Sequence, residues 1–133
     1  MSSNNPDPVR LARTYLDTME ARDLDTARSL LAPDFTAIFP GPRIFNKLED
    51  LVASGAARYR FVRKTYARTY QTTEGRDGID VVIFSGTLRG EWADGTAFDG
   101  IRFTDQFRIR DGVITEQQVW NDMGEALLAR STG

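Results

Sequence analysis

The first third of the chain shows apolar residues at helical spacing. Asp7 and Pro8 are typical of a helix start, with the aspartate as the N-cap and the proline at the first helical position. Apolar side chains then follow at intervals of three or four residues, at Val9, Ala12, Leu16 and Met19. A second helix is expected to begin after Asp23 and to end at Pro33, and residues 47–58 carry a third, weaker helical pattern.

The pattern changes to that of a sheet after the third helix. From Arg60 to Asp122 it predicts four long strands, preceded by a short extended segment at residues 35–39. The breaks between the long strands fall in glycine-containing turns at residues 74–78, 93–96 and 110–112. Residues 123–130 are expected to add a helical turn. Helices followed by a meander of antiparallel strands indicate an α+β fold, with the helices packed on one face of the sheet.

Asp105 breaks the alternation of the third long strand. Because strand side chains alternate between two faces, the apolar residues of one face are Ile101, Phe103, Phe107 and Ile109. The same period places Asp105 among them, where an ionised carboxylate is costly and its pKa is raised. Carboxyls with shifted pKa values cluster at functional sites, so Asp105 is a candidate site residue. The alternative is a structural role, as the partner of an arginine or as a cap of buried backbone.

Tyr15 is a second candidate, beside the apolar stripe of the first helix. Its phenol is able to donate a hydrogen bond into a pocket. The alternative is a core aromatic residue whose hydroxyl finds a partner at the surface.

The last strand, residues 113–122, has no plain core face. One face carries Thr115, Gln117, Val119 and Asn121, and the other carries Ile114, Glu116, Gln118, Trp120 and Asp122. Such a mixture of aromatic and amide side chains suits a subunit interface or a pocket wall. Which face lines a pocket depends on the length of the preceding turn, since a change of one residue exchanges the two faces.

Composition narrows the chemistry that these residues can perform. The 133 residues indicate one domain, 1–133, with residues 1–7 as a flexible N-terminus. The chain has no cysteine and no histidine, which excludes disulfides, thiolate nucleophiles, zinc fingers and histidine-based triads. Any general acid or base must be Asp, Glu, Tyr or Lys. No metal-loop or phosphate-loop motif is present, and we expect neither a metal nor a cofactor.

Charge and hydropathy bear on partners and location. The net charge is −2, with 17 basic residues of which only Lys47 and Lys64 are lysines, and this gives no electrostatic footprint for nucleic acid. The apolar runs are far shorter than a membrane span, and the polar N-terminus lacks the pattern of a signal peptide. We therefore expect a cytoplasmic protein without a nucleic-acid or membrane partner.

Short motifs spread along nearly the whole chain resemble one family in their order and spacing. They are Ala21-Arg22-Asp23-Leu24, the Leu-Ala-Pro-Asp-Phe run at 31–35, the Gly41-Pro42 loop, the Arg-Asp-Gly-Val-Ile turn at 110–114 and Val-Trp-Asn-Asp at 119–122. Together with Tyr15 they resemble the nuclear-transport-factor-2-like superfamily in its SnoaL-like branch. The resemblance implies a cone-shaped half-barrel, in which three N-terminal helices close a curved, mainly antiparallel sheet around a pocket. It also implies a homodimer that pairs through the outer face of the sheet.

The resemblance to ketosteroid isomerases of this superfamily implies roles for individual residues. Tyr15 and Asp105 fall on the positions of the tyrosine and the protonated aspartic acid that form the isomerase's oxyanion hole. The isomerase's general base falls on Phe39, which is unable to accept a proton. The acid–arginine–acid set of limonene-epoxide hydrolases falls on Ser85, Thr87 and Val119, and scytalone dehydratases depend on histidines that this chain lacks.

Two functions follow as hypotheses. In the first, the protein is an enzyme that isomerises, cyclises or dehydrates a hydrophobic carbonyl compound without a cofactor. Tyr15 and neutral Asp105 donate hydrogen bonds to the oxyanion in this hypothesis. In a variant of it, Asp105 is ionised and is itself the base. In the second, the same fold is a non-catalytic ligand-binding or dimeric interaction domain. The expected pocket lining is Met19, Phe39, Phe103, Phe107, Val119, Trp120, Asn121 and Asp122.

Overall fold

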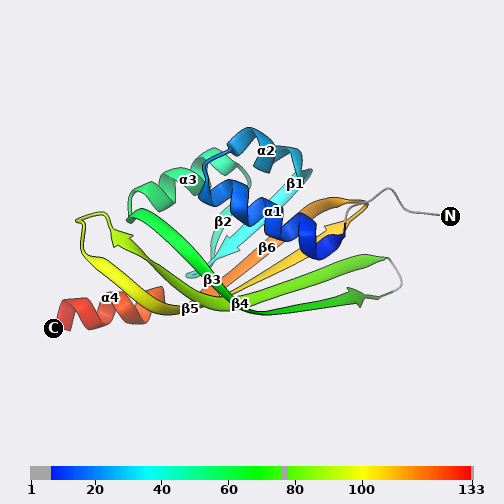
Figure 1. Ribbon diagram of the computed structural model, residues 1–133. Helices are drawn as coiled ribbons and strands as arrows, with labels where there is room; N and C mark the ends of the chain where they lie inside the picture. The colour runs from blue at the N-terminus through cyan, green and yellow to red at the C-terminus, as the bar shows by residue number, and fades with distance from the viewer. Residues whose placement is uncertain (1–6, 76–77, 133) are drawn as a thin grey trace.

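The computed structural model describes residues 7–75 and 78–132, which form four helices and six strands (Figure 1). In chain order these are α1 (Pro8–Glu20), α2 (Leu24–Ser29), β1 (Leu31–Phe39), β2 (Arg43–Phe45), α3 (Leu48–Ala56), β3 (Tyr59–Glu74), β4 (Ile79–Trp92), β5 (Ala97–Arg110), β6 (Val113–Asn121) and α4 (Met123–Thr132). Of the expected flexible N-terminus, residues 1–6 lie outside the described residues. Asp7 belongs to the helix start, because its side chain accepts a hydrogen bond from the backbone N–H of Arg10.

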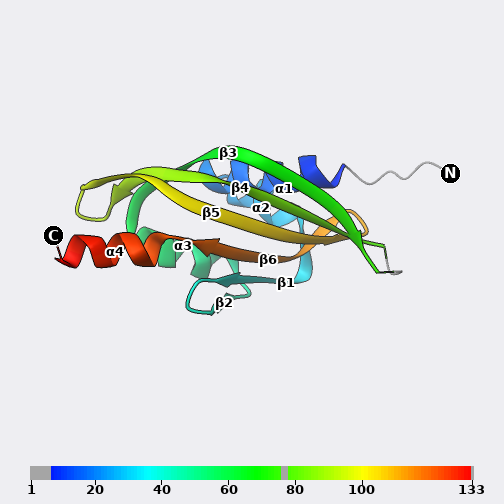
Figure 2. The same cartoon turned by 90° about the horizontal axis from the view of Figure 1, so that it is seen from below.

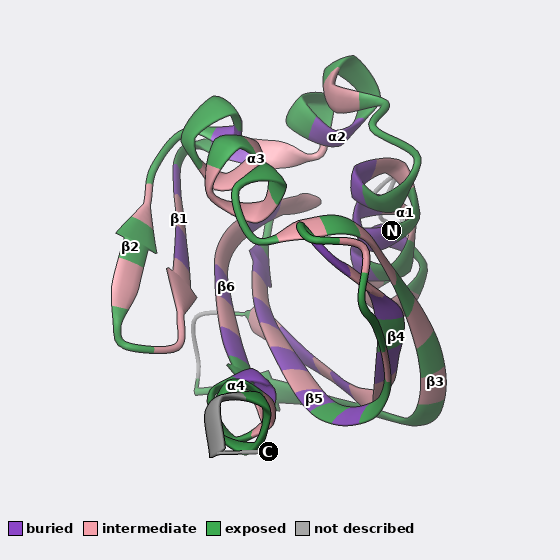
Figure 3. Cartoon of the chain, turned by 90° about the vertical axis from the view of Figure 1, so that its left-hand side faces the viewer, coloured by how far each residue is buried: buried purple, intermediate pink, exposed green. Residues whose placement is uncertain are grey.

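The six strands form one curved sheet in the order β2-β1-β6-β5-β4-β3. Strands β1 and β6 pair in parallel, and every other neighbouring pair is antiparallel. Helices α1, α2 and α3 lie on the concave side of the sheet, and α4 continues beyond the end of β6 (Figures 1 and 3). The predicted α+β cone with three N-terminal helices on a mainly antiparallel sheet is confirmed.

Helix α1 is the main cover of the concave face. Its buried side chains form one stripe, as the helical spacing predicts: Leu11, Ala12, Tyr15, Leu16 and Met19. They pack against the inward-facing side chains of the long strands, which include Val82, Phe84, Phe103 and Phe107. This packing of helix on sheet supplies most of the hydrophobic core and fixes where Tyr15 stands relative to β5.

Three elements differ from the sequence-based expectation. Helix α2 ends at Ser29, and Pro33 lies inside β1 instead of ending the helix. Proline is accommodated there because the β1–β6 register shifts between Leu31 and Thr36, where a missing N–H breaks no regular ladder. The short strand β2, which pairs with β1 after the Pro40–Pro42 turn, was not predicted, and α4 is a helix of 10 residues instead of a single turn.

The bend of the sheet depends on Gly86 in β4. The β3–β4 register shifts between Tyr66 and Arg68, directly opposite this glycine, and the backbone of β3 comes unusually close. A Cβ atom at Gly86 would overlap the carbonyl oxygen of Thr65, so only glycine allows this approach. The bulge and the glycine together let β3 and β4 curl over the concave face.

Replacing Gly86 by alanine is expected to reduce the free energy of unfolding by about 2–3 kcal/mol, because the added methyl group forces the backbones of β3 and β4 apart. Gly55→Ala is the matched control, since a Cβ atom at Gly55 in α3 meets no atom within 4 Å and alanine favours a helix. Urea unfolding measures both variants. Equal stability of Gly86→Ala and wild type would contradict the role given to this glycine.

Candidate functional site

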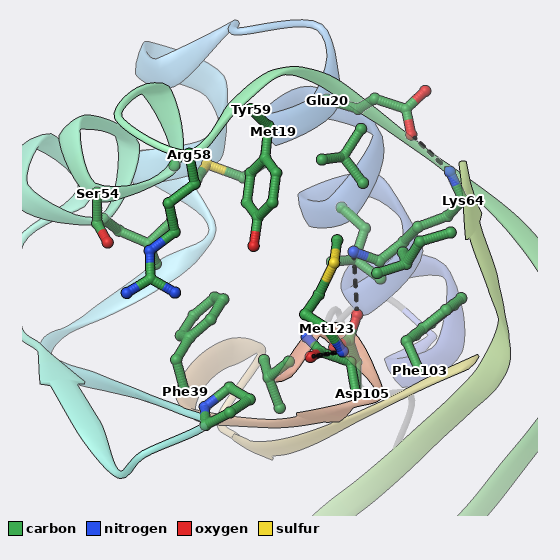
Figure 4. Close-up of a pocket in the computed structure, with 18 of the residues that line it drawn as sticks. Met19, Glu20, Phe39, Ser54, Arg58, Tyr59, Lys64, Phe103, Asp105 and Met123 are labelled. Atoms are coloured by element: carbon green, nitrogen blue, oxygen red, sulfur yellow. Dashed lines mark hydrogen bonds and ion pairs between the residues drawn. The ribbon is translucent and has the colours of Figure 1, made fainter. Parts of the chain in front are cut away.

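A cavity of about 650 Å³ lies between the helices and the concave face of the sheet (Figure 4). Its wall is contributed by α1, the end of β1, β2, α3, the first half of β3, Leu88 of β4, the middle of β5, the end of β6 and the first half of α4. A volume of this size is in the range of pockets that bind small organic molecules. The site therefore arises from elements far apart in the sequence, brought together by the curvature of the sheet.

Seven of the ten site residues expected from the sequence line this cavity: Tyr15, Met19, Phe39, Phe103, Asp105, Val119 and Asn121. The alternation of β5 holds, because Phe103, Asp105 and Phe107 all point to the concave side and are buried. In β6 the cavity is reached by Gln117, Val119 and Asn121, which answers the question of which face of this strand is inward.

Three expected lining residues lie elsewhere. Phe107 is fully buried in the core, where its ring packs edge-on against Tyr15 and Phe84. Trp120 is 51% exposed and Asp122 forms an ion pair with Arg102, because alternation along β6 turns both away from the cavity. The pairing of β5 with β6 shifts by one residue between Arg108 and Ile109, and this shift decides which residues of β6 face the cavity.

Asp105 is the centre of the site. It is only 1% exposed, and neither of its carboxyl oxygens has a hydrogen-bond partner among the described residues. The Nζ atom of Lys64 lies 3.4 Å from its Oδ2, close enough for an ion pair. Burial raises the pKa of Asp105, and the charge of Lys64 opposes this effect without cancelling it. The ion-pair partner is therefore a lysine, and not one of the arginines considered from the sequence.

Tyr15 faces the same cavity from α1. Its ring is held between Phe35 and Phe107, with centroid distances of 6.0 and 5.9 Å. The hydroxyl oxygen is buried and has no hydrogen-bond partner among the described residues. Burial raises the pKa of Tyr15 far above its ordinary value, and the nearby charge of Asp105 adds to this effect. The phenol therefore stays protonated throughout the physiological range of pH and is able to donate a hydrogen bond.

Lys64 is the important residue that reasoning from the sequence missed. It stands in β3 opposite Leu88, with 22% of its side chain exposed, and its ammonium lies 5.1 Å from the centre of the Phe103 ring. Glu20 of α1 accepts a hydrogen bond from its backbone N–H at 3.4 Å (Figure 4). A signal was present, since Lys64 is one of only two lysines and alternates with Val62 and Tyr66 on one face of its strand.

The opposite side of the cavity was also not expected from the sequence. Ser54 of α3, Arg58 just before β3 and Tyr59 at its start lie there, and Phe39 lies between Arg58 and Asp105 in the view of Figure 4. The cavity therefore has two polar regions with an apolar surface between them. We call the first, formed by Tyr15, Lys64 and Asp105, the inner polar region.

The described residues contain neither a cluster of metal ligands nor a membrane-spanning helix. Within residues 7–75 and 78–132, no three acidic side chains cluster closely enough to hold a metal ion. In the same part of the chain, no helix combines the length and the apolar character needed to cross a membrane.

Solved structures share this architecture over nearly the whole chain. An NTF2-like protein of unknown function from Burkholderia pseudomallei matches with a TM-score of 0.75 and 18% identity, covering 96% of each chain. IdmH, a putative polyketide cyclase from Streptomyces antibioticus, matches with a TM-score of 0.75 and 21% identity, covering 96% of this chain and 100% of its own. TerC, crystallised with polyporic acid, matches with a TM-score of 0.72 and 17% identity, covering 88% and 92%.

At these identities the structural matches establish the fold alone, and no curated protein matches the sequence. The sequence itself provides the family. The model of the SnoaL-like domain matches residues 12–117, which extend from the first helix to the inward-facing glutamine of β6. With most of the chain matched in sequence and the NTF2-like cone present in three dimensions, the protein belongs to the SnoaL-like domain family.

Proposed function

We propose that the protein binds a hydrophobic carbonyl compound in its cavity and catalyses its isomerisation, cyclisation or dehydration without a cofactor. In this proposal, Tyr15 and neutral Asp105 donate hydrogen bonds to the carbonyl oxygen and stabilise the enolate that forms. Polyketide cyclases and a complex with polyporic acid among the structural relatives support a ligand of this general kind.

One observation carries the proposal: the buried polar atoms without hydrogen-bond partners gather on the wall of a single cavity. In the described part of the chain these are the hydroxyl of Tyr15, both oxygens of Asp105 and the amide oxygen of Gln117. An unpaired buried polar group costs about 1–3 kcal/mol, so a fold seldom retains several of them together. A ligand oxygen placed between Tyr15 and Asp105 would satisfy both donors at once.

The protonation state of Asp105 decides how the site would work. A neutral carboxyl is a donor, and the raised pKa of Asp105 favours this form. Negative charge on an enolate oxygen would also be stabilised by the ammonium of Lys64, which lies 3.4 Å from Asp105. This ammonium could give a proton to the ligand but could not remove one, so the proton lost when the enolate forms would go to a basic group of the ligand itself. In the variant mechanism, Lys64 keeps Asp105 ionised and the carboxylate itself is the base.

A second candidate is ligand binding without catalysis, and Phe39 is the observation that favours it. In the resemblance to ketosteroid isomerases, this position holds the general base. Here the phenyl ring lines the cavity and packs edge-on against Phe45, with the ring centroids 5.6 Å apart. A ligand would therefore meet an apolar surface at the place where the isomerase removes a proton.

We also propose that the protein forms a homodimer through the outer, convex face of the sheet. No described helix covers this face (Figure 2). Trp120 of β6 and Tyr70 of β3 lie on it, each 51% exposed, and the cross-strand partner of Tyr70 is Ile83. Aromatic side chains exposed on an uncovered sheet are typical of an interface.

Removing the Tyr15 hydroxyl tests the binding mode. A panel of steroids, anthraquinones and phenols is first screened for compounds that raise the melting temperature. For a carbonyl ligand found in this way, Tyr15→Phe is expected to weaken binding about tenfold, because one buried hydrogen bond is lost. The control is Tyr70→Phe on the convex face, which should leave the affinity unchanged. A panel in which no compound stabilises the protein would contradict the proposed function.

The pH dependence of stability tests the protonation state. Burial raises the pKa of Asp105 above its ordinary value of 3.8. Between pH 4 and this higher pKa, Asp105 is therefore protonated in the folded state and ionised in the unfolded state. The contribution of this group to stability is therefore present at acid pH and is lost as the pH rises through the folded pKa, by at most about 1.4 kcal/mol per pH unit.

The Asp105→Asn variant lacks the titrating carboxyl. The free energy of unfolding of this variant, compared with that of wild type, should therefore rise between pH 4 and the folded pKa of Asp105. Urea unfolding at a series of pH values measures the difference, and carbonyl NMR follows the titration of Asp105 directly. An aspartate that is already ionised near pH 5 would exclude the donor role and leave the variant mechanism, in which the carboxylate is the base.

The dimer is tested by light scattering coupled to gel filtration. The wild type is expected to have the mass of two chains, and Trp120→Lys the mass of one, because a lysine at the centre of a sheet interface is desolvated without a partner. Ala53→Lys adds the same charge to the exposed side of α3 and should remain a dimer. A monomeric wild type would overturn this part of the proposal.

A further inference from the structure

Two arginines on one side of the cavity wall, Arg43 and Arg58, have no acidic partner among the described residues. The Arg43 guanidinium donates from Nε to the carbonyl oxygen of Pro40 at 3.1 Å and from Nη1 to Oγ of Ser54 at 2.8 Å, and both acceptors are neutral. The Arg58 side chain points into the cavity, and within the described residues its guanidinium has neither an ion pair nor a hydrogen bond (Figure 4). The charge of this region is therefore not neutralised by the protein.

Three of the four other cations on the wall lie beside an acidic residue. The pairs are Arg63 with Glu20 at 3.7 Å, Arg60 with Glu91 at 3.8 Å and Lys64 with Asp105 at 3.4 Å. Arg22 lies at the edge of the cavity and donates to the carbonyl oxygen of Met19 at the end of α1. The two acidic residues on the wall, Glu20 and Asp105, thus lie beside Arg63 and Lys64, on the far side from Arg43 and Arg58.

Arg43 and Arg58 are close enough to repel each other. The pKa of Arg43 is lowered, first by burial and then by the positive charge of Arg58. Two like charges near each other at a partly desolvated surface are unfavourable unless an anion neutralises them. Pro40 and Ser54 hold the Arg43 guanidinium in place without using its second terminal nitrogen, so donors remain for such an anion.

We propose that Arg43 and Arg58 bind a carboxylate of the ligand, so that the ligand is a hydrophobic keto acid. This inference rests on the proposed function, because it adds a second contact point to the same ligand. The carbonyl oxygen lies in the inner polar region, the apolar body lies against Met19, Phe39 and Met123, and the carboxylate lies beside Arg58 and Ser54 at the opposite side (Figure 4).

The donors available suit a carboxylate. Arg43 has already committed two of its N–H groups to Pro40 and Ser54, and Arg58 contributes one guanidinium from an exposed position. A carboxylate has two oxygens in a plane that match the fork of a guanidinium. The apolar surface between the two polar regions suits a ligand in which an apolar body joins the carboxylate to the carbonyl.

The experiment compares a charged and a neutral probe with the same ring system, anthraquinone-2-carboxylate and its methyl ester, by isothermal titration calorimetry at pH 7. Both have ring carbonyls for the inner polar region, and only the acid has the anion. Wild type is expected to bind the acid about tenfold more tightly than the ester, and this preference should shrink at high salt. Arg58→Gln should remove the preference while leaving the affinity for the ester within about twofold.

Arg110→Gln, at the exposed end of β5 and away from the cavity wall, is the control and should keep the full preference. Equal affinity of wild type for acid and ester would overturn the carboxylate site alone and leave the proposed carbonyl pocket intact. An equal loss of both affinities in Arg58→Gln would also overturn it, because the arginine would then act by packing. Failure of both probes to bind wild type would overturn the carbonyl pocket and the carboxylate site together.

Discussion

The burial of one carboxyl group is the constraint on which the site depends. Asp105 belongs to a strand whose other inward side chains are apolar, and the two-residue period of the strand leaves it no outward position. Lys64 arrives from two strands away in the sheet, across β4, and lies within ion-pair distance. The positive charge of Lys64 offsets part of the cost of desolvating this carboxyl, since it opposes the effect of burial on the pKa of Asp105.

Much of the architecture follows from local patterns. The capped start of α1, the four long strands and the inward position of Asp105 are each dictated by a period or a turn motif that the sequence shows directly. The strand β2 could not be anticipated, because three residues are too few to show a period. Pro33 was misjudged because a proline inside a strand is tolerated only where the register is irregular, and irregular register is a property of the partner strand.

The candidate site was predictable to the extent that it depends on single residues. Tyr15 and Asp105 could be singled out because each breaks or borders an apolar pattern. The sequence left open which face of β6 is inward, and the expected lining included Trp120 and Asp122 from the outward face, because a register shift between Arg108 and Ile109 decides which face turns inward. Lys64 and Arg58 were missed for a different reason. Strand β3, which begins directly after Arg58, lies at the edge of the sheet and is exposed over much of its length. Its sequence therefore alternates too weakly between apolar and polar residues to show which face is inward.

The parallel pairing of β1 with β6 joins two parts of the chain that are distant in sequence, for example Leu31 with Ile114. Strand β1 ends at the aromatic wall formed by Phe39, and β6 provides Gln117, Val119 and Asn121, so the cavity is bounded by an early and a late segment. During synthesis the early helices and β1 must therefore wait for β6 before a wall exists, and closing so large a loop makes this step slow. The cavity wall is therefore complete only once the β1–β6 pairs have formed.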